Sequence, residues 1–167
     1  MKILAISGSL SKTSGNRTLL GVAGKKTPPD VTFHVWDGLR DLPHFDPELE
    51  ADGPLPEVEE LRQALRSADA VLLACPEYGH SLPGSLKNAI DWVIGSGELE
   101  QKVVGITAAV PHPDRGRRGL GALRDTLGAV SAVVVGGEPI AKGPSFEAEV
   151  GRLVVSLIEA ARAPREE

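Results

Sequence analysis

Residues 70–75, AVLLAC, form a continuous apolar run in a chain of 167 residues. A strand that packs against helices on both of its faces is apolar throughout, whereas a strand with one face in water alternates apolar and polar residues. The run therefore predicts the central strand of a parallel sheet that lies between two layers of helices.

Strands and helices are expected to alternate along the whole chain. Apolar segments predict strands at 2–7, 31–36, 70–75, 102–108 and 132–135. Apolar stripes with helical spacing predict five helices, at 16–24, 57–68, 83–94, 120–130 and 146–163. This alternation is typical of an α/β protein with a parallel, doubly wound sheet joined by right-handed crossovers.

Two strand orders compete for this pattern. In the flavodoxin-like order, 2-1-3-4-5, the first and third strands flank the point where the chain reverses direction across the sheet, and ligands bind there, outside the carboxyl ends of the strands. We expect this order, in a three-layer α/β fold with five parallel strands and helices on both faces. A single domain should span residues 1–167. The loops after Ser7 and Cys75 then form the expected site.

Composition excludes several classes of partner and site. The net charge of -5 argues against nucleic acid and anionic membranes, which need a broad basic face. Cys75 is the only cysteine, so the chain can form neither an internal disulfide nor a cysteine-rich metal site. No segment has the length of a signal peptide or a membrane span, and we expect a cytoplasmic protein.

The segment 37–56 is long and rich in proline. We expect the prolines to prevent regular structure there and four apolar residues to hold the segment against the body of the protein: Leu39, Leu42, Phe45 and Leu49. It is either a lid or a packed loop, and the packed loop is favoured.

Residues 7–18, SGSLSKTSGNRT, have the composition of an anion-binding loop. A strand that breaks into glycines and hydroxyls and then opens a helix presents unpaired N–H groups and the positive end of a helix dipole. Residues 1–29 also contain basic residues but no Asp or Glu. A phosphate is the expected ligand.

The loop at 76–83 is longer than a simple connection between a strand and a helix requires. We expect its backbone to line a planar group, with Tyr78 as a wall. The chain lacks the G-x-G-x-x-G dinucleotide fingerprint, the G-K-[ST] phosphate loop and the G-x-S-x-G nucleophile elbow.

Together the two loops resemble the NADPH-dependent FMN reductase family, which includes chromate, quinone and azo-dye reductases. The matching residues are Gly8-Ser9-Leu10 with Ser14 and Asn16, then Pro76-Glu77-Tyr78 with Ser81, Pro83-Gly84 and the segment 86–92, LKNAIDW. The resemblance implies a flavodoxin-like fold, bound FMN, reduction by NADPH or NADH, and a homodimer or homotetramer.

The resemblance also assigns roles to residues. The FMN phosphate would lie on Ser9, Ser11, Ser14 and Asn16, with Lys12 or Arg17 beside it. The flavin ring would lie along Pro76, Glu77, Tyr78, Gly79, His80 and Ser81. The flavin itself would carry the chemistry, so no catalytic side chain and no metal is expected.

Two positions depart from the family pattern. The family commonly has Arg at the position of Ser11, so the phosphate loses a fixed bidentate partner. It commonly has Asn at the position of Gly79, so an amide that would face the flavin is lost while the backbone stays free to adopt positive φ. Both changes are expected to affect FMN affinity rather than the fold.

The third loop of the expected site carries a basic cluster. Arg115, Arg117 and Arg118 either hold the phosphates of an incoming nicotinamide nucleotide or belong to a solvated basic loop. We expect Cys75 to be a small buried apolar residue, Trp92 to lie in the core or a subunit interface, and His80 and His112 to be solvated or to shape substrate access.

The expected function is that of an NAD(P)H oxidoreductase that reduces a small-molecule acceptor by ping-pong hydride transfer. Quinones, azo compounds, metal oxyanions and free flavin are the candidate acceptors. Two alternatives stay open: an electron carrier that binds FMN without enzymatic activity, and a relative that has lost FMN and serves as a binding module.

Overall fold

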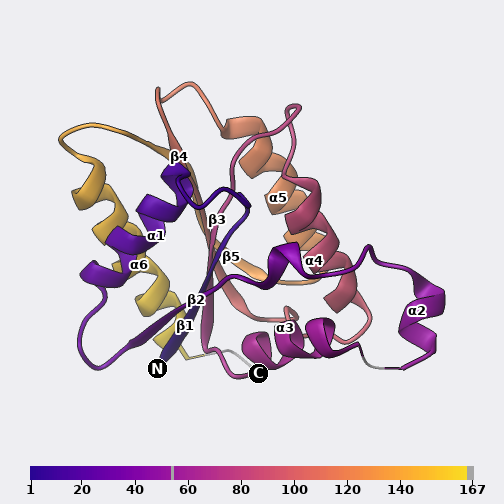
Figure 1. Ribbon diagram of the computed structural model, residues 1–167. Helices are drawn as coiled ribbons and strands as arrows, with labels where there is room; N and C mark the ends of the chain where they lie inside the picture. The colour runs from indigo at the N-terminus through magenta and orange to yellow at the C-terminus, as the bar shows by residue number, and fades with distance from the viewer. Residues whose placement is uncertain (54, 165–167) are drawn as a thin grey trace.

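A computed structural model describes residues 1–53 and 55–164 and contains a five-stranded sheet in the order β2-β1-β3-β4-β5 (Figure 1). The strands are β1 (Lys2–Ser7), β2 (Thr32–Trp36), β3 (Ala70–Ala74), β4 (Val103–Val110) and β5 (Val133–Ala141). All neighbouring strands pair in parallel. The flavodoxin-like order predicted from the sequence is therefore confirmed.

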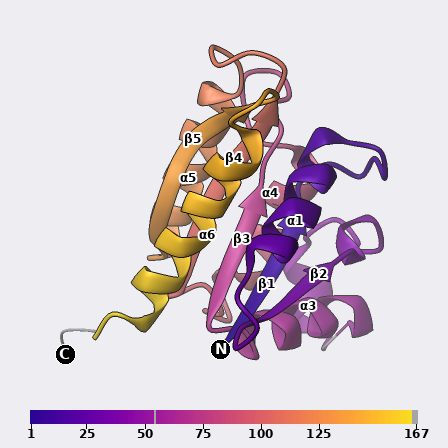
Figure 2. The same ribbon diagram turned by 90° about the vertical axis from the view of Figure 1, so that its left-hand side faces the viewer.

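Helices cover both faces of the sheet, which gives the three expected layers (Figure 2). One face packs against α1 (Gly15–Lys26) and α6 (Phe146–Arg162), and the other against α3 (Pro56–Arg66), α4 (Gly84–Ile94) and α5 (Arg117–Ala129). Successive side chains of β3 alternate between the two cores: Leu72 belongs to the first, and Val71 and Leu73 to the second. The central strand is buried on both faces, as the apolar run predicts.

Cys75 follows β3 directly and is fully buried. Burial, with a smaller contribution from the charge of Glu77, raises the pKa of its thiol to about 12. The thiol is therefore protonated at neutral pH and behaves as the small apolar residue that the sequence predicts.

The expectation that prolines prevent regular structure in residues 37–56 is wrong. The segment contains a 3-10 helix, η1 (Gly38–Arg40), and a short α-helix, α2 (Pro47–Ala51). Proline is tolerated in the first turn of a helix, where its missing N–H has no partner to lose, and Pro47 and Pro56 each begin a helix. Pro54 lies outside the described residues.

The segment is held against α4 near its middle. Trp92 Nε1 and Asn88 Nδ2 both donate to the carbonyl of Pro43, at 2.8 and 2.9 Å, and Asn88 Oδ1 accepts from the N–H of Phe45 at 2.7 Å. The ring of Phe45 meets that of Trp92 edge to face, with centroids 5.1 Å apart. These contacts favour a packed loop over a lid, and they place Trp92 in the core.

Of the four apolar residues expected to hold the segment down, Leu39 and Leu42 are buried and Phe45 packs on the core. Leu49 does not do so, because it lies on α2 with 38% of its surface exposed.

Most element boundaries differ from the expectation by one or more residues, and three of these differences affect the site. Helix α1 begins at Gly15, because the Ser14 side chain accepts from the N–H of Arg17 at 3.2 Å and caps the helix there. Helix α5 begins at Arg117 and not at 120. Strand β5 continues to Ala141, past glycines 136 and 137, and a β-bulge between Ile106 and Ala108 shifts its register on β4.

Candidate functional site

The loops that follow β1, β3 and β4 meet at the carboxyl end of the sheet. The N–H of Gly8 donates to the carbonyl of Ala74 at 2.9 Å, and the hydroxyl oxygens of Ser9 and Tyr78 lie 3.4 Å apart. From the β4 side, the N–H of Ala109 donates to Asn16 Oδ1 at 2.9 Å. The structure thus brings the two sequence-predicted loops together at the topological switch point.

Gly8 allows the first two loops to approach so closely. A Cβ atom at this position would lie 3.1 Å from Pro76 Cδ and 3.2 Å from Leu86 Cδ2. Any larger residue at position 8 would push the loop after β1 away from the loop after β3.

Polar groups gather at the first turn of α1. Ser9 and Asn16 are each only 5% exposed, and Ser9 Oγ accepts from the N–H of Ser11 at 3.3 Å. Asn16 Oδ1 accepts a hydrogen bond from the N–H of Ala109. No atom of residues 1–53 or 55–164 accepts a hydrogen bond from Asn16 Nδ2. The N–H groups of Gly15 and Asn16 occupy the first helical turn, where an α-helix provides no internal acceptor.

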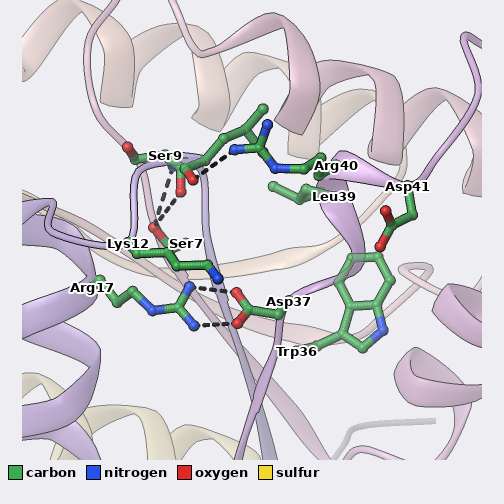
Figure 3. A pocket seen from close by; sticks show the side chains of 10 residues that line it. Ser7, Ser9, Lys12, Arg17, Trp36, Asp37, Leu39, Arg40 and Asp41 are labelled. Atoms are coloured by element: carbon green, nitrogen blue, oxygen red, sulfur yellow. Dashed lines mark hydrogen bonds and ion pairs between the residues drawn. The ribbon is translucent and has the colours of Figure 1, made fainter.

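Two of the predicted phosphate partners lie on the other side of this loop, toward β2 (Figure 3). Lys12 and Arg17 line a cavity of about 280 Å³ together with Ser9, which is also a predicted phosphate partner, and with Asp37 and Arg40. Both terminal nitrogens of Arg17 donate to the carboxylate of Asp37. This pairing raises the pKa of Arg17 and lowers the pKa of Asp37.

Ser11 is exposed, and its hydroxyl lies 3.3 Å from that of Thr13. It carries no charge that could replace the Arg of the family pattern.

The loop after β3 forms a tight turn from Tyr78 to Ser81. These two residues exchange two backbone hydrogen bonds of 3.0 Å, and the central residues, Gly79 and His80, have φ of 56° and 63°. Positive φ at both central positions is the pattern of a type I′ turn, which favours Gly and Asn. Tyr78 is 55% exposed, so its ring is available as the expected wall.

Glu77 contacts both this turn and α5. Its carboxylate accepts from the N–H groups of Arg118 and Gly119, at 3.0 and 3.1 Å, and lies 3.3 Å from His80 Nδ1. The Gly119 hydrogen bond is the main cause that lowers the pKa of Glu77. The residue therefore ties the loop after β3 to the N-terminus of α5, a role that the sequence analysis did not identify.

The three arginines of the third loop differ in their partners. Arg117 is paired with Glu138, with 2.5 Å between Nη1 and Oε2. Arg115 and Arg118 are exposed, and within the described residues neither side chain lies within 4.0 Å of a carboxylate. His112, in the same loop, is also exposed.

Lys142 is a candidate that the sequence analysis missed. A Cβ atom built on Gly15 would lie 3.3 Å from Lys142 Cε and 3.6 Å from its Nζ, so this lysine reaches the first turn of α1. The predicted fifth strand stopped at 135, and residue 142 therefore had no expected place beside the site. In the part of the chain that the structure describes, no cluster of His, Cys, Asp and Glu could hold a metal ion.

Known proteins resemble this chain both in sequence and in structure. Residues 1–143 match the family model described as NADPH-dependent FMN reductase. An NAD(P)H-dependent FMN reductase of Pseudomonas aeruginosa is 40% identical over 119 residues, which cover 71% of this chain and 63% of the relative. A quinone reductase of Escherichia coli is 34% identical over 94 residues, or 56% of this chain and 50% of the relative. The chain thus spans between half and two thirds of these two relatives.

Solved structures agree over a larger part of the chain. The flavoenzyme NAD(P)H:(acceptor) oxidoreductase FerB from Paracoccus denitrificans superposes with a TM-score of 0.82 at 27% identity, over 95% of this chain and 98% of that one. The apo form of an NADH:FMN oxidoreductase superposes with a TM-score of 0.72 over 99% of this chain and 91% of that one, and at 21% identity it supports the fold alone. The sheet order, the adjoining loops after β1 and β3 and the match over residues 1–143 lead to one conclusion: the chain belongs to the NADPH-dependent FMN reductase family.

Proposed function

We propose that the chain binds FMN at the carboxyl ends of β1, β3 and β4 and reduces a small-molecule acceptor with electrons from NADPH or NADH. The observation that carries this proposal is the position of Asn16: the N–H of Ala109 holds its Oδ1, and its Nδ2 donates to no atom of the described residues, so the Nδ2 is available to a ligand.

The donors around Asn16 fit the phosphate of FMN. Its Nδ2 and the N–H groups of Gly15 and Asn16 are hydrogen-bond donors at the positive end of α1, and the hydroxyls of Ser9 and Ser14 lie in the same loop. A phosphate accepts hydrogen bonds on all of its terminal oxygens.

The turn after β3 fits the flat ring. The backbone from Pro76 to Ser81 would bind the ring edge, and the exposed ring of Tyr78 would cover part of one side. When bound, FMN supplies the hydride chemistry. The protein's own contribution is to hold the ring in place: Glu77 fixes this turn against α5, and Gly79 lets it turn tightly.

Arg115 and Arg118 would bind the phosphates of the nicotinamide nucleotide, since both are exposed beside the site without a carboxylate partner. The acceptor would use the same open side after the nucleotide leaves, which gives ping-pong kinetics. Quinones, azo compounds, metal oxyanions and free flavin are the proposed acceptors. Arg117 contributes less, because Glu138 occupies its guanidinium.

The proposal includes a homodimer or homotetramer and a cytoplasmic location, both in keeping with the family resemblance. The net charge of -5 speaks against nucleic acid as a partner. No helix within the described residues is long and apolar enough to cross a membrane.

An absorbance spectrum and one rapid-mixing experiment test the proposed function. The purified protein should show flavin absorbance or acquire it with added FMN, and anaerobic mixing with NADPH should bleach that absorbance quickly. Flavin that binds but is not bleached would instead support an electron carrier. A protein that takes up no FMN would support a binding module. Initial rates at several acceptor concentrations should give parallel reciprocal lines, and intersecting lines would contradict ping-pong exchange.

A further inference from the structure

We propose that Lys142, at the end of β5, provides the positive charge that holds the FMN phosphate in this chain. The inference rests on the proposed FMN binding and deepens it. Lys142 lies outside the two loops that resemble the family. In this proposal its charge replaces that of the arginine that the family commonly has at the position of Ser11.

The position of Lys142 is fixed through the end of β4. The N–H of Lys142 donates to the carbonyl of Val110 at 2.9 Å. The N–H of Ala109, which precedes Val110 in β4, donates to Asn16 Oδ1 at 2.9 Å. Two adjacent residues of β4 thus anchor Lys142 and Asn16 to the same strand end. The backbone of Lys142 and the amide of Asn16 therefore keep their relative positions.

Gly15 leaves the space that the lysine side chain crosses. A Cβ at position 15 would lie 3.3 Å from Lys142 Cε and 3.4 Å from Ala109 Cβ, tighter than most contacts of real Cβ atoms. The lysine and the glycine also line one open cavity of about 290 Å³, with Thr18, Gly143, Phe146 and Glu147. The side chain of Lys142 consequently lies beside Gly15, the first residue of α1.

Two other basic side chains lie near this loop. Arg17 is paired with Asp37, whereas Lys12 has no carboxylate within 4.0 Å among the described residues and lines, with Ser9, the cavity on the β2 side (Figure 3). Lys142 also has no carboxylate within 4.0 Å among the described residues, and Glu147, which lines the same cavity, is paired with Lys26 at 3.1 Å. A free ammonium next to unpaired N–H donors attracts an anion strongly, because the two kinds of donor act on the same charge.

The test compares FMN with riboflavin, which has the same ring but no phosphate. Equilibrium titrations by flavin fluorescence use the apoprotein of the full chain and its Lys142→Gln variant, at low and at high ionic strength. We expect Lys142→Gln to weaken FMN binding about fivefold at low ionic strength, to leave riboflavin binding unchanged and to reduce the salt dependence of FMN affinity. Lys142→Arg should bind FMN like the wild type.

The control is Lys25→Gln, which removes an exposed lysine at the other end of α1. It changes the net charge by the same amount and should not change the FMN to riboflavin preference. The inference is overturned if Lys142→Gln binds FMN like the wild type or if Lys25→Gln weakens FMN equally. A wild-type protein that binds no FMN would contradict the proposed function itself, which is a different outcome.

A second variant tests the link between the glycine and the lysine. Gly15→Ala should weaken FMN binding in the wild type, because the new methyl group displaces the lysine side chain, but should have little effect in Lys142→Gln. Equal effects of Gly15→Ala in both backgrounds would show that the two residues act independently, and would contradict the role given to Gly15.

Discussion

The carboxylate of Glu77 accepts a hydrogen bond of 3.1 Å from the backbone N–H of Gly119. These residues lie on different loops of the site, and the contact joins the turn after β3 to the first turn of α5. The approach is close: a Cβ at Gly119 would lie 3.0 Å from Glu77 Cα and 3.1 Å from the carbonyl of Ser81. The two loops proposed for the flavin ring and the nicotinamide nucleotide are therefore positioned together.

We predict that Glu77→Gln lowers the stability of the protein at neutral pH and that this loss disappears in acid. The folded structure lowers the pKa of Glu77, chiefly through the Gly119 hydrogen bond, so the native state favours the ionised carboxylate. The stabilisation is complete above the ordinary glutamate pKa of about 4.3 and is lost as pH falls through the lowered pKa of the folded state.

Thermal unfolding of the wild type and of Glu77→Gln over a range of pH measures this effect. Glu159→Gln, at an exposed position of α6, is the control for a general loss of negative charge. A melting difference between wild type and Glu77→Gln that stays constant from neutral to acidic pH would disprove the prediction.

Gly79 should accept asparagine but not valine. Its φ of 56° lies in the left-handed region, which Asn tolerates and a β-branched residue does not. No atom lies within 4 Å of a Cβ built at this position, so only the backbone conformation matters for stability. We expect Gly79→Val to lose about 1–2 kcal/mol and Gly79→Asn much less, measured by chemical unfolding. Gly84→Val serves as a control, because that position also has open space but no positive φ. Equal losses for the two Gly79 variants would contradict the strain argument.

The double variant Arg115→Ala with Arg118→Ala should raise the KM for NADPH without a matching fall in kcat. Both side chains are exposed beside the site and have no carboxylate partner in the described residues, so they can bind the phosphates of the nucleotide. Arg117→Ala should have a smaller effect, since Glu138 already holds that guanidinium. Steady-state kinetics with a quinone as acceptor provides the measurement. If KM for NADPH is unaltered in the double variant, the arginines belong to a solvated loop.

The sequence predicts the sheet well where the signal is local. The bounds of β1 are as expected, and β3 differs only at Cys75, because apolar runs between helical segments mark buried strands. The last part of β5 was missed, since Gly136, Gly137 and Glu138 interrupt the apolar pattern while backbone pairing with β4 continues. Helix α2 was missed because a proline was interpreted as a breaker where it begins a helix.

The sequence predicts which loops form the site, but not which partners the charged side chains contact. Topology alone brings the ends of β1 and β3 together, so these loops could be named in advance. Which way a side chain points depends on partners far along the chain. Arg17 turns to Asp37, Glu77 turns to Gly119, and Lys142 reaches Gly15 from the other end of the sequence. No spacing within a single segment indicates such contacts.

Restoring the family arginine at Ser11 should tighten FMN binding and should also compensate for the loss of Lys142. Ser11 is exposed, so a longer side chain can be accommodated there, and a guanidinium binds phosphate with two parallel hydrogen bonds. We expect Ser11→Arg to bind FMN several-fold more tightly than the wild type while riboflavin affinity is unchanged. In the Lys142→Gln background the same substitution should return FMN affinity to at least the wild-type value, because one cation then replaces the other. The titrations with FMN and riboflavin measure both effects, and Ser11→Lys separates a point charge from bidentate binding. If Ser11→Arg leaves FMN affinity unchanged or weaker in both backgrounds, the phosphate does not lie beside residue 11, and the binding loop must hold it from another side.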